Sequence, residues 1–144
     1  MTVASILKTK GSETITLPEN STVEEAVALL AEKRIGAVVV AASDGGVAGI
    51  FSERDVVRGL SGLGTDLLQS AVSTLMTRDV VTCASSDTID AVMEKMSQGR
   101  FRHVPVVEDG RLIGIISIGD IVKSKISQLE HETSAMRDYI AGHG

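Results

Sequence analysis

The chain has 144 residues, a formal net charge of −5, 43% apolar residues and only 2% aromatic residues, enough for one compact unit or two small ones around an aliphatic core. The negative charge argues against general nucleic-acid binding, and no apolar run approaches the roughly 18 residues of a membrane span. With a single cysteine, Cys83, and no signal-peptide core at its start, we expect a cytoplasmic protein without disulfide, metal or membrane contact.

The first half of the sequence has the pattern of strand, helix, strand, strand, helix. In chain order, the predicted elements are a strand over 14–17, a helix over 22–33, a buried strand over 37–41, a hairpin turn over 43–46, a return strand over 47–51 and a helix from Glu53. The helix follows from apolar residues at helical spacing, with Ser21 or Thr22 as its cap. The strand over 37–41 is apolar throughout, as expected for a strand covered on both faces.

The second half repeats this order. The predicted elements are a strand over 80–83, a helix over 88–98, a strand over 103–107, a turn over 108–110, a return strand over 111–116 and a long helix from Ile118. Glycines and small polar residues mark 59–73 as a linker, with a short helix around 66–70. An apolar stripe on the last helix either packs on the chain's own core or pairs with a partner; it consists of Ile121, Val122, Ile126, Leu129, Met136 and Ile140.

An internal repeat organises the chain. The phrase GIFSERDVV, which contains Ser52 and Asp55, returns as GIISIGDIV, which contains Ser117 and Asp120, 65 positions later. Upstream the match continues at an offset of 66, and residues 5–10 resemble 73–78. A repeat of this length is a complete folding unit. We therefore divide the chain into a first repeat (3–62), a linker (63–72), a second repeat (73–126) and a helical tail (127–144).

Each repeated phrase has two interpretations. A serine followed three residues later by an acid, before apolar residues, is close to a capping box that begins a helix. The same groups suit a ligand that carries neighbouring hydroxyls and a phosphate, because a carboxylate can accept from both hydroxyls while a helix N-terminus favours phosphate. The two roles are compatible for each serine.

The two phrases, together with the run RFRHVPVV over 100–107, resemble a tandem pair of CBS domains, the regulatory modules named after cystathionine β-synthase. The resemblance covers about residues 3–126. It implies an α/β (α+β type) fold of two βαββα repeats, each with a small three-stranded sheet and two helices, packed about a pseudo-twofold axis. It also implies clefts between the repeats that bind adenine nucleotides, and pairing of two chains into a disc-like dimer.

The resemblance assigns roles to residues at matching positions. Asp55 and Asp120 hold ribose, Ser52 and Ser117 lie near ribose or phosphate, and Arg102 and His103 reach a phosphate. Strand alternation places Arg100 and Arg102 on one face and His103 on the other, unless the strand start is irregular. Arg54 either binds a phosphate or pairs with an acid on the surface. The apolar candidates either line a slot for the base or belong to the ordinary core; they are Ile15, Val81 and Ile115, with Val38, Val104 and Ile50.

Three functions compete. The first is a non-catalytic sensor that binds an adenosyl ligand, foremost AMP, with ADP, ATP, NAD(H) or S-adenosylmethionine as alternatives, and signals to an unidentified effector protein. The second, an enzyme, is disfavoured, because His131-Glu132 lacks the second histidine of a zinc-protease motif and Cys83 has no evident base. The third is a structural homodimerisation module with empty clefts.

Overall fold

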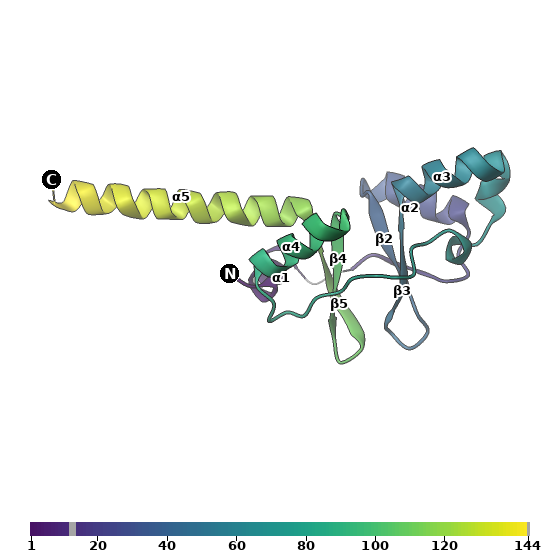
Figure 1. Cartoon of the computed structure of the whole chain (residues 1–144), viewed down its shortest axis with the longest axis horizontal. Helices are drawn as coiled ribbons and strands as arrows, with labels where there is room; N and C mark the ends of the chain where they lie inside the picture. The colour runs from purple at the N-terminus through teal and green to yellow at the C-terminus, as the bar shows by residue number, and fades with distance from the viewer. Residues whose placement is uncertain (12–13, 144) are drawn as a thin grey trace.

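The computed structural model describes residues 1–11 and 14–143, with side chains up to residue 141. The helices are α1 (Val3–Lys10), α2 (Val23–Lys33), α3 (Glu53–Leu63), α4 (Ile89–Gly99) and α5 (Ile118–His143), with short 3-10 turns η1 (Gly64–Gln69) and η2 (Val72–Thr74). The strands are β1 (Thr16–Pro18), β2 (Ala37–Ala41), β3 (Val47–Ser52), β4 (His103–Glu108) and β5 (Arg111–Ser117). The two β-hairpins stand next to each other, and α5 extends far beyond the rest of the molecule (Figure 1).

The two sheets differ by one strand. In the first, β1 runs parallel to β2, and β2 runs antiparallel to β3. The second contains only the antiparallel pair β4 and β5. The predicted strand over 80–83 is reduced to Cys83, whose amide donates to Pro105 (3.0 Å) and whose carbonyl accepts from Val107 (2.9 Å). A three-stranded second sheet was therefore the wrong expectation, because the chain turns at Val80, whose amide bonds Arg78 (3.0 Å).

The core of each repeat is completed by a segment that leads into the other repeat. Val3, Ile6 and Leu7 of α1, at the start of the first repeat, pack among the buried residues of the second. Val72, the last residue of the linker, and Met76, at the start of the second repeat, pack in the first core. The two segments are held in the same way by a backbone hydrogen bond at their start: the Val3 amide donates to Asp87 O (2.9 Å), and the Val72 amide donates to Ser21 O (2.8 Å).

We call the two segments that pack into the other repeat's core, which begin at Val3 and at Val72, the crossing segments. Equivalent residues in them are 69 positions apart, one more than the alignment of 5–10 with 73–78 predicts. The side chains agree with it: Ser5 Oγ donates to Thr2 O (2.6 Å), and Thr74 Oγ1 donates to Ala71 O (2.7 Å). The repeats are thus related by the predicted pseudo-twofold symmetry. The boundaries between repeats, linker and tail stay a prediction.

The crossing segments explain why both repeated phrases begin with glycine. A Cβ on Gly49 would lie 2.7 Å from Thr77 O, and one on Gly114 would lie 2.5 Å from a methyl carbon of Leu7. In the first repeat the close approach includes two backbone hydrogen bonds between Ile50 and Thr77, of 2.8 and 2.9 Å. The glycine therefore allows the other repeat's segment to pass directly against the strand before the functional phrase.

The last helix continues past the core that it caps. Ile121 is buried, but the rest of the predicted apolar stripe is exposed, so the stripe does not pack on the chain's own core. Across 1–11 and 14–143, no helix combines the length and apolar character required to cross a bilayer.

Candidate functional site

A cleft of about 620 Å³ lies between the two repeats. One wall is the junction of β3 and α3, which supplies Ser52, Glu53, Arg54 and Arg58. The opposite wall is the junction of α4 and β4, which supplies the run from Gly99 to His103. The floor comes from the crossing segment and β3, with Thr77, Asp79, Val80, Val81 and Ile50. Because both repeats contribute, a ligand in this cleft would contact both at once.

Cations dominate the cleft although the chain is acidic. Its lining contains four arginines against the two acids Glu53 and Asp79; the arginines are Arg54, Arg58, Arg100 and Arg102. Among the described residues, only Arg58 of these four forms an ion pair with a carboxylate. Unpaired guanidinium groups in a cleft are suited to a phosphate, on which an arginine can donate two hydrogen bonds.

An irregular strand start brings Arg100, Arg102 and His103 together on the cleft. Arg100 ends α4 in the left-handed conformation (φ 57°, ψ 37°), so β4 begins only at His103. The alternation that would place Arg102 and His103 on opposite faces does not apply before the strand begins. Burial lowers the pKa of His103 below its usual value, and nearby Lys10 lowers it further.

Asp55 lies behind the cleft wall. Its side chain is 1% exposed. One carboxylate oxygen accepts from the Ser52 amide (2.9 Å) and hydroxyl (3.2 Å), and the other accepts from Arg58 one turn along α3. In this arrangement Asp55 is the acid of the predicted helix cap, and its hydrogen bonds are to Ser52 and Arg58, at the end of β3 and in α3.

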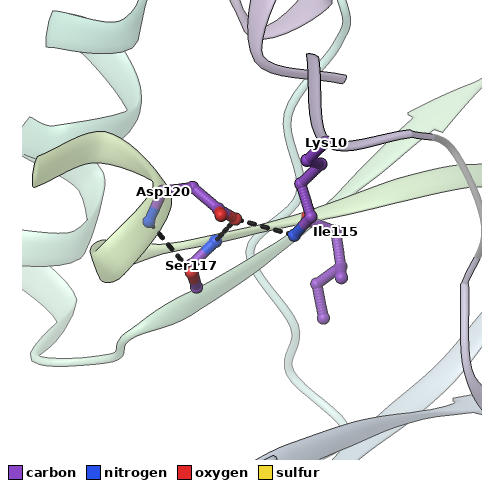
Figure 2. Close-up of polar contacts among 4 residues, drawn as sticks. All are labelled: Lys10, Ile115, Ser117 and Asp120. Carbon is purple, nitrogen blue, oxygen red and sulfur yellow. Dashed lines mark hydrogen bonds and ion pairs between the residues drawn. The ribbon is translucent and has the colours of Figure 1, made fainter. Parts of the chain in front are cut away.

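Asp120 makes the same cap with a different cation (Figure 2). Its carboxylate accepts from the Ser117 amide (2.9 Å), and the Ser117 hydroxyl accepts from the Asp120 amide (3.1 Å). Lys10, from α1, donates to the same carboxylate oxygen (2.7 Å) and to Ile115 O (2.9 Å). Burial raises the pKa of Asp120, but the hydrogen bonds from Lys10 and Ser117 outweigh it and hold the pKa below 3.8.

A smaller cavity of about 200 Å³ lies beside Asp120, between α1 and α5. Lys10 and Lys123 line it, together with Ser5, Thr9, Ser124 and Ser127. It is separate from the cleft, whose lining contains neither Ser117 nor Asp120.

The predicted site residues therefore fall into two groups. Five of them line the cleft: Ser52, Arg54, Arg102, His103 and Val81. The other five do not line it: Asp55, Ser117, Asp120, Ile15 and Ile115. Of the apolar pair, Ile15 packs against the first core, and Ile115 is half-buried beside Lys10.

Sequence reasoning missed Arg58, Phe101 and Asp79. The position of Arg58, three residues after Asp55, was a usable signal, since such pairs meet on a helix. Phe101 stands between Arg100 and Arg102, which was a usable signal, whereas no sequence signal places Asp79 at the cleft because its position depends on how the segment around Thr77 runs.

The remaining chemistry-bearing groups do not form a second centre. Burial, assisted by Asp87, raises the pKa of Cys83 to about 11, so its thiol stays protonated near neutral pH. Within the described ranges, no three histidine, cysteine or acidic side chains cluster as metal ligands would.

Comparison with known proteins places this geometry in a family. The model of the CBS domain matches residues 3–62 and 72–127, two copies that cover most of the chain. The chain belongs to the CBS-domain family. Pairs of CBS domains are generally regulatory, ligand-binding modules.

Similar proteins share the CBS pair. The crystal structure of the CBS-domain containing protein ATU1752 from Agrobacterium tumefaciens is 49% identical, with a TM-score of 0.82, covering 86% of this chain and 92% of that one. The CBS domain pair of protein MJ0100, solved in complex with 5′-methylthioadenosine and S-adenosyl-L-methionine, is 27% identical, with a TM-score of 0.79, covering 89% and 98%.

Several curated relatives are much longer than this chain. The Arabidopsis thaliana protein CBSCBSPB3 is 32% identical over 126 residues, which are 88% of this chain and 23% of the relative. The chain thus spans about a quarter of the length of that relative and of others named in the same series.

Proposed function

We propose that the cleft binds an adenosine nucleotide, AMP in the first place, with ADP, ATP or NAD(H) as alternatives. No catalytic step is involved: occupancy fixes the orientation of the two repeats, and a partner protein responds to that orientation. The observation that carries the proposal is a set of three arginines on one cleft, Arg54, Arg100 and Arg102, which form no ion pair with an acid within 1–11 and 14–141, in a chain of net charge −5.

We assign the phosphate to the cleft wall formed by the junction of α4 and β4. Arg102 and His103 lie there with Arg100, and Arg54 faces them from the helix start of α3. The start of α3 also favours an anion, because Ser52, Glu53 and Arg54 line the cleft there and the helix dipole is positive at its N-terminus. A phosphate between these walls would contact both repeats.

The base and ribose are assigned to the floor. Ile50, Val80 and Val81 offer an aliphatic slot, which suits a chain with no tryptophan. Ser52 reaches the cleft directly, whereas Asp55 is held by Arg58. We propose that Arg58, 66% exposed, leaves Asp55 for the phosphate when the ribose hydroxyls arrive.

Asp120 and Ser117 are proposed to serve a second binding event. Lys10 occupies the carboxylate of Asp120, and the neighbouring cavity is about a third of the size of the cleft. A ribose at Asp120 must therefore displace Lys10, which makes this event weaker than binding in the cleft.

S-adenosylmethionine is the alternative ligand, because the CBS pair of MJ0100 was solved with it. It carries a sulfonium cation and no phosphate, so the unpaired arginines favour a nucleotide over it. A homodimer that leaves the cleft empty is the other alternative.

The ligand that accompanies the purified protein tests the proposal. With one tyrosine and no tryptophan, the protein absorbs weakly at 280 nm, so a bound nucleotide would dominate its spectrum near 260 nm. We expect mass spectrometry of the extracted ligand to identify an adenosine phosphate, and AMP to raise the melting temperature of the stripped protein. A protein without a 260 nm band, whose melting temperature no adenosine compound changes, would contradict the proposal.

A further inference from the structure

The projecting part of α5 carries an apolar seam with a repeat of 3.5 residues. Its positions are separated by four, three, four, three and four residues, and they are Val122, Ile126, Leu129, Thr133, Met136 and Ile140. Five of these six are apolar. A seam at this spacing is typical of a two-stranded coiled coil, in which such positions are called a and d. An ordinary surface helix carries a wider apolar face.

The seam is open although α5 is docked at its base. Its five apolar side chains are 50–61% exposed. The face that contacts the rest of the chain is a different one: Ile121 is buried, and the Lys125 ammonium bonds Asp90 of α4. That face also includes the half-buried Ser124 and Gln128, and at about 100° per residue the centre of the seam lies about 110° around the helix from the centre of that face. A second helix can therefore approach the seam without disturbing the core.

We infer that this seam pairs with the same seam of a second copy of the chain, side by side and in the same direction, as a parallel two-stranded coiled coil. The two copies then present one surface to each other, as in a twofold dimer. Both pairs of CBS repeats lie at the same end of the coiled coil.

The charges beside the seam select a second copy in this direction. In a parallel pair, a residue before an a position meets the residue five places later in the other helix. Here Glu132 of one copy meets Arg137 of the other, and Lys125 meets Glu130. Both contacts join opposite charges, and the symmetry of the dimer makes each of them twice.

The antiparallel arrangement brings like charges together. With the seams fully overlapped, Glu132 meets Glu132 and Glu130 meets Glu130. On the same side Lys123 meets Arg137. Each such contact opposes pairing, so the same sequence that favours the parallel dimer disfavours its reverse.

The contact between Glu132 and Arg137 is the decisive one. Lys125 already holds Asp90 within its own chain, so it is shared between two acids. Among the residues that the structure describes, Glu132 accepts one long bond, from Gln128 (3.5 Å), and Arg137 lies beside the seam with Leu129 and Thr133.

Cysteine cross-linking of the full chain tests the direction. In a parallel pair, position 136 faces position 136, so Met136→Cys should form a disulfide-linked dimer under mild oxidation. His131→Cys, on the opposite side of α5, is the matched control and should remain uncrosslinked. The native Cys83 is buried and does not interfere. Failure of Met136→Cys to cross-link more than the control would overturn the inference, as would cross-linking of both to the same extent.

Charge reversal tests the selectivity in the Met136→Cys chain. Glu132→Arg or Arg137→Glu alone should lower cross-linking several-fold, and a mixture of the two single variants should restore it through mixed dimers. An antiparallel pair would respond differently, because Arg137→Glu would then meet Lys123 and increase association, which contradicts a parallel pair. Both substitutions lie on the projecting helix, and an unchanged melting temperature of the repeats verifies that they leave the core intact.

Discussion

The two repeated phrases form the same helix cap, but the capping acid pairs with a different cation in each repeat. In the first repeat, Arg58 comes from one turn along the same helix, and the phrase opens on the cleft. In the second, Lys10 comes from α1 at the other end of the chain and closes the phrase with bonds to Asp120 and Ile115. Both repeats thus have the same helix cap. Whether the space beside the cap stays open depends on whether the cation comes from the same helix, as Arg58 does, or from α1, as Lys10 does.

The largest difference in stability that we expect between the two repeats concerns the glycine that begins each phrase. Gly49→Ala places a Cβ 2.7 Å from the backbone oxygen of Thr77, whereas Gly114→Ala meets only the flexible end of Leu7. We expect a loss of about 3 kcal/mol in the free energy of unfolding for Gly49→Ala and about 1 kcal/mol for Gly114→Ala, as measured by urea denaturation. Equal losses would show that the two crossings are equally adaptable.

The cleft should depend on Arg102 more than on any arginine outside it. Removing one charge-assisted contact costs about 1.5–3 kcal/mol, so Arg102→Ala should weaken AMP binding by about 10- to 100-fold in calorimetry. Arg111→Ala, an exposed arginine at the start of β5 and outside the cleft lining, is the control and should leave the affinity unchanged. Equal affinities for both variants would remove Arg102 from the site.

The two capping acids should differ in their effect on stability. Asp55→Ala removes a buried carboxylate and leaves the part-buried Ser52 amide without its acceptor, and we expect a loss of about 2 kcal/mol. Asp120→Ala should cost about 1 kcal/mol, because Asp120 is 21% exposed and water can replace part of its contacts. Thermal unfolding of both variants measures the order, and a larger loss for Asp120→Ala would reverse the interpretation of Lys10.

The smallest effect is a pH dependence from His103. Its folded pKa lies below 6.5, mainly through burial, so the unfolded chain takes up a proton first as the pH falls through that value. Stability should therefore decrease from pH 7.5 to pH 5.5, and His103→Asn should reduce this decrease. A phosphate nearby should raise the pKa of His103, so AMP should bind with proton uptake near pH 6. A wild-type decrease that His103→Asn leaves intact would assign it to another group.

At acidic pH, the dependence of stability on pH has a second contribution, which comes from the capping acid of the second repeat. The pKa of Asp120 is lowered in the folded chain, so its contribution to stability is present above pH 3.8 and is lost as the pH falls through the folded value. Asp120→Asn should therefore flatten the loss of stability below about pH 4. An unchanged acid profile would indicate that Lys10 does not stabilise the carboxylate.

Much of the fold was predictable because its signals are local. Thr22, one of the two predicted caps, caps α2, and Thr88, the first residue of the predicted second helix, caps α4; each accepts from an amide three residues later at 3.1 Å. The short helix around 66–70 appears as η1. The strand over 80–83 failed because apolar residues at a strand spacing do not reveal that Val81 faces a cleft rather than a neighbouring strand.

The parts that sequence reasoning missed depend on distant contacts. The bond between Lys10 and Asp120 joins residues 110 positions apart, and no local pattern predicts it. The packing of α1 into the second core is of the same kind. The sequence did predict both capping acids and the arginines of the second repeat, but only the folded chain separates the residues on the cleft from those behind it.

A calorimetric titration of the ligand-free protein with AMP and with adenosine tests the central claim most directly. If the unpaired arginines hold a phosphate, AMP binds at least about tenfold more tightly than adenosine, and Arg102→Ala abolishes most of the difference. Equal affinities for AMP and adenosine, or no binding of AMP, would contradict the assignment of the cleft to an adenosine nucleotide.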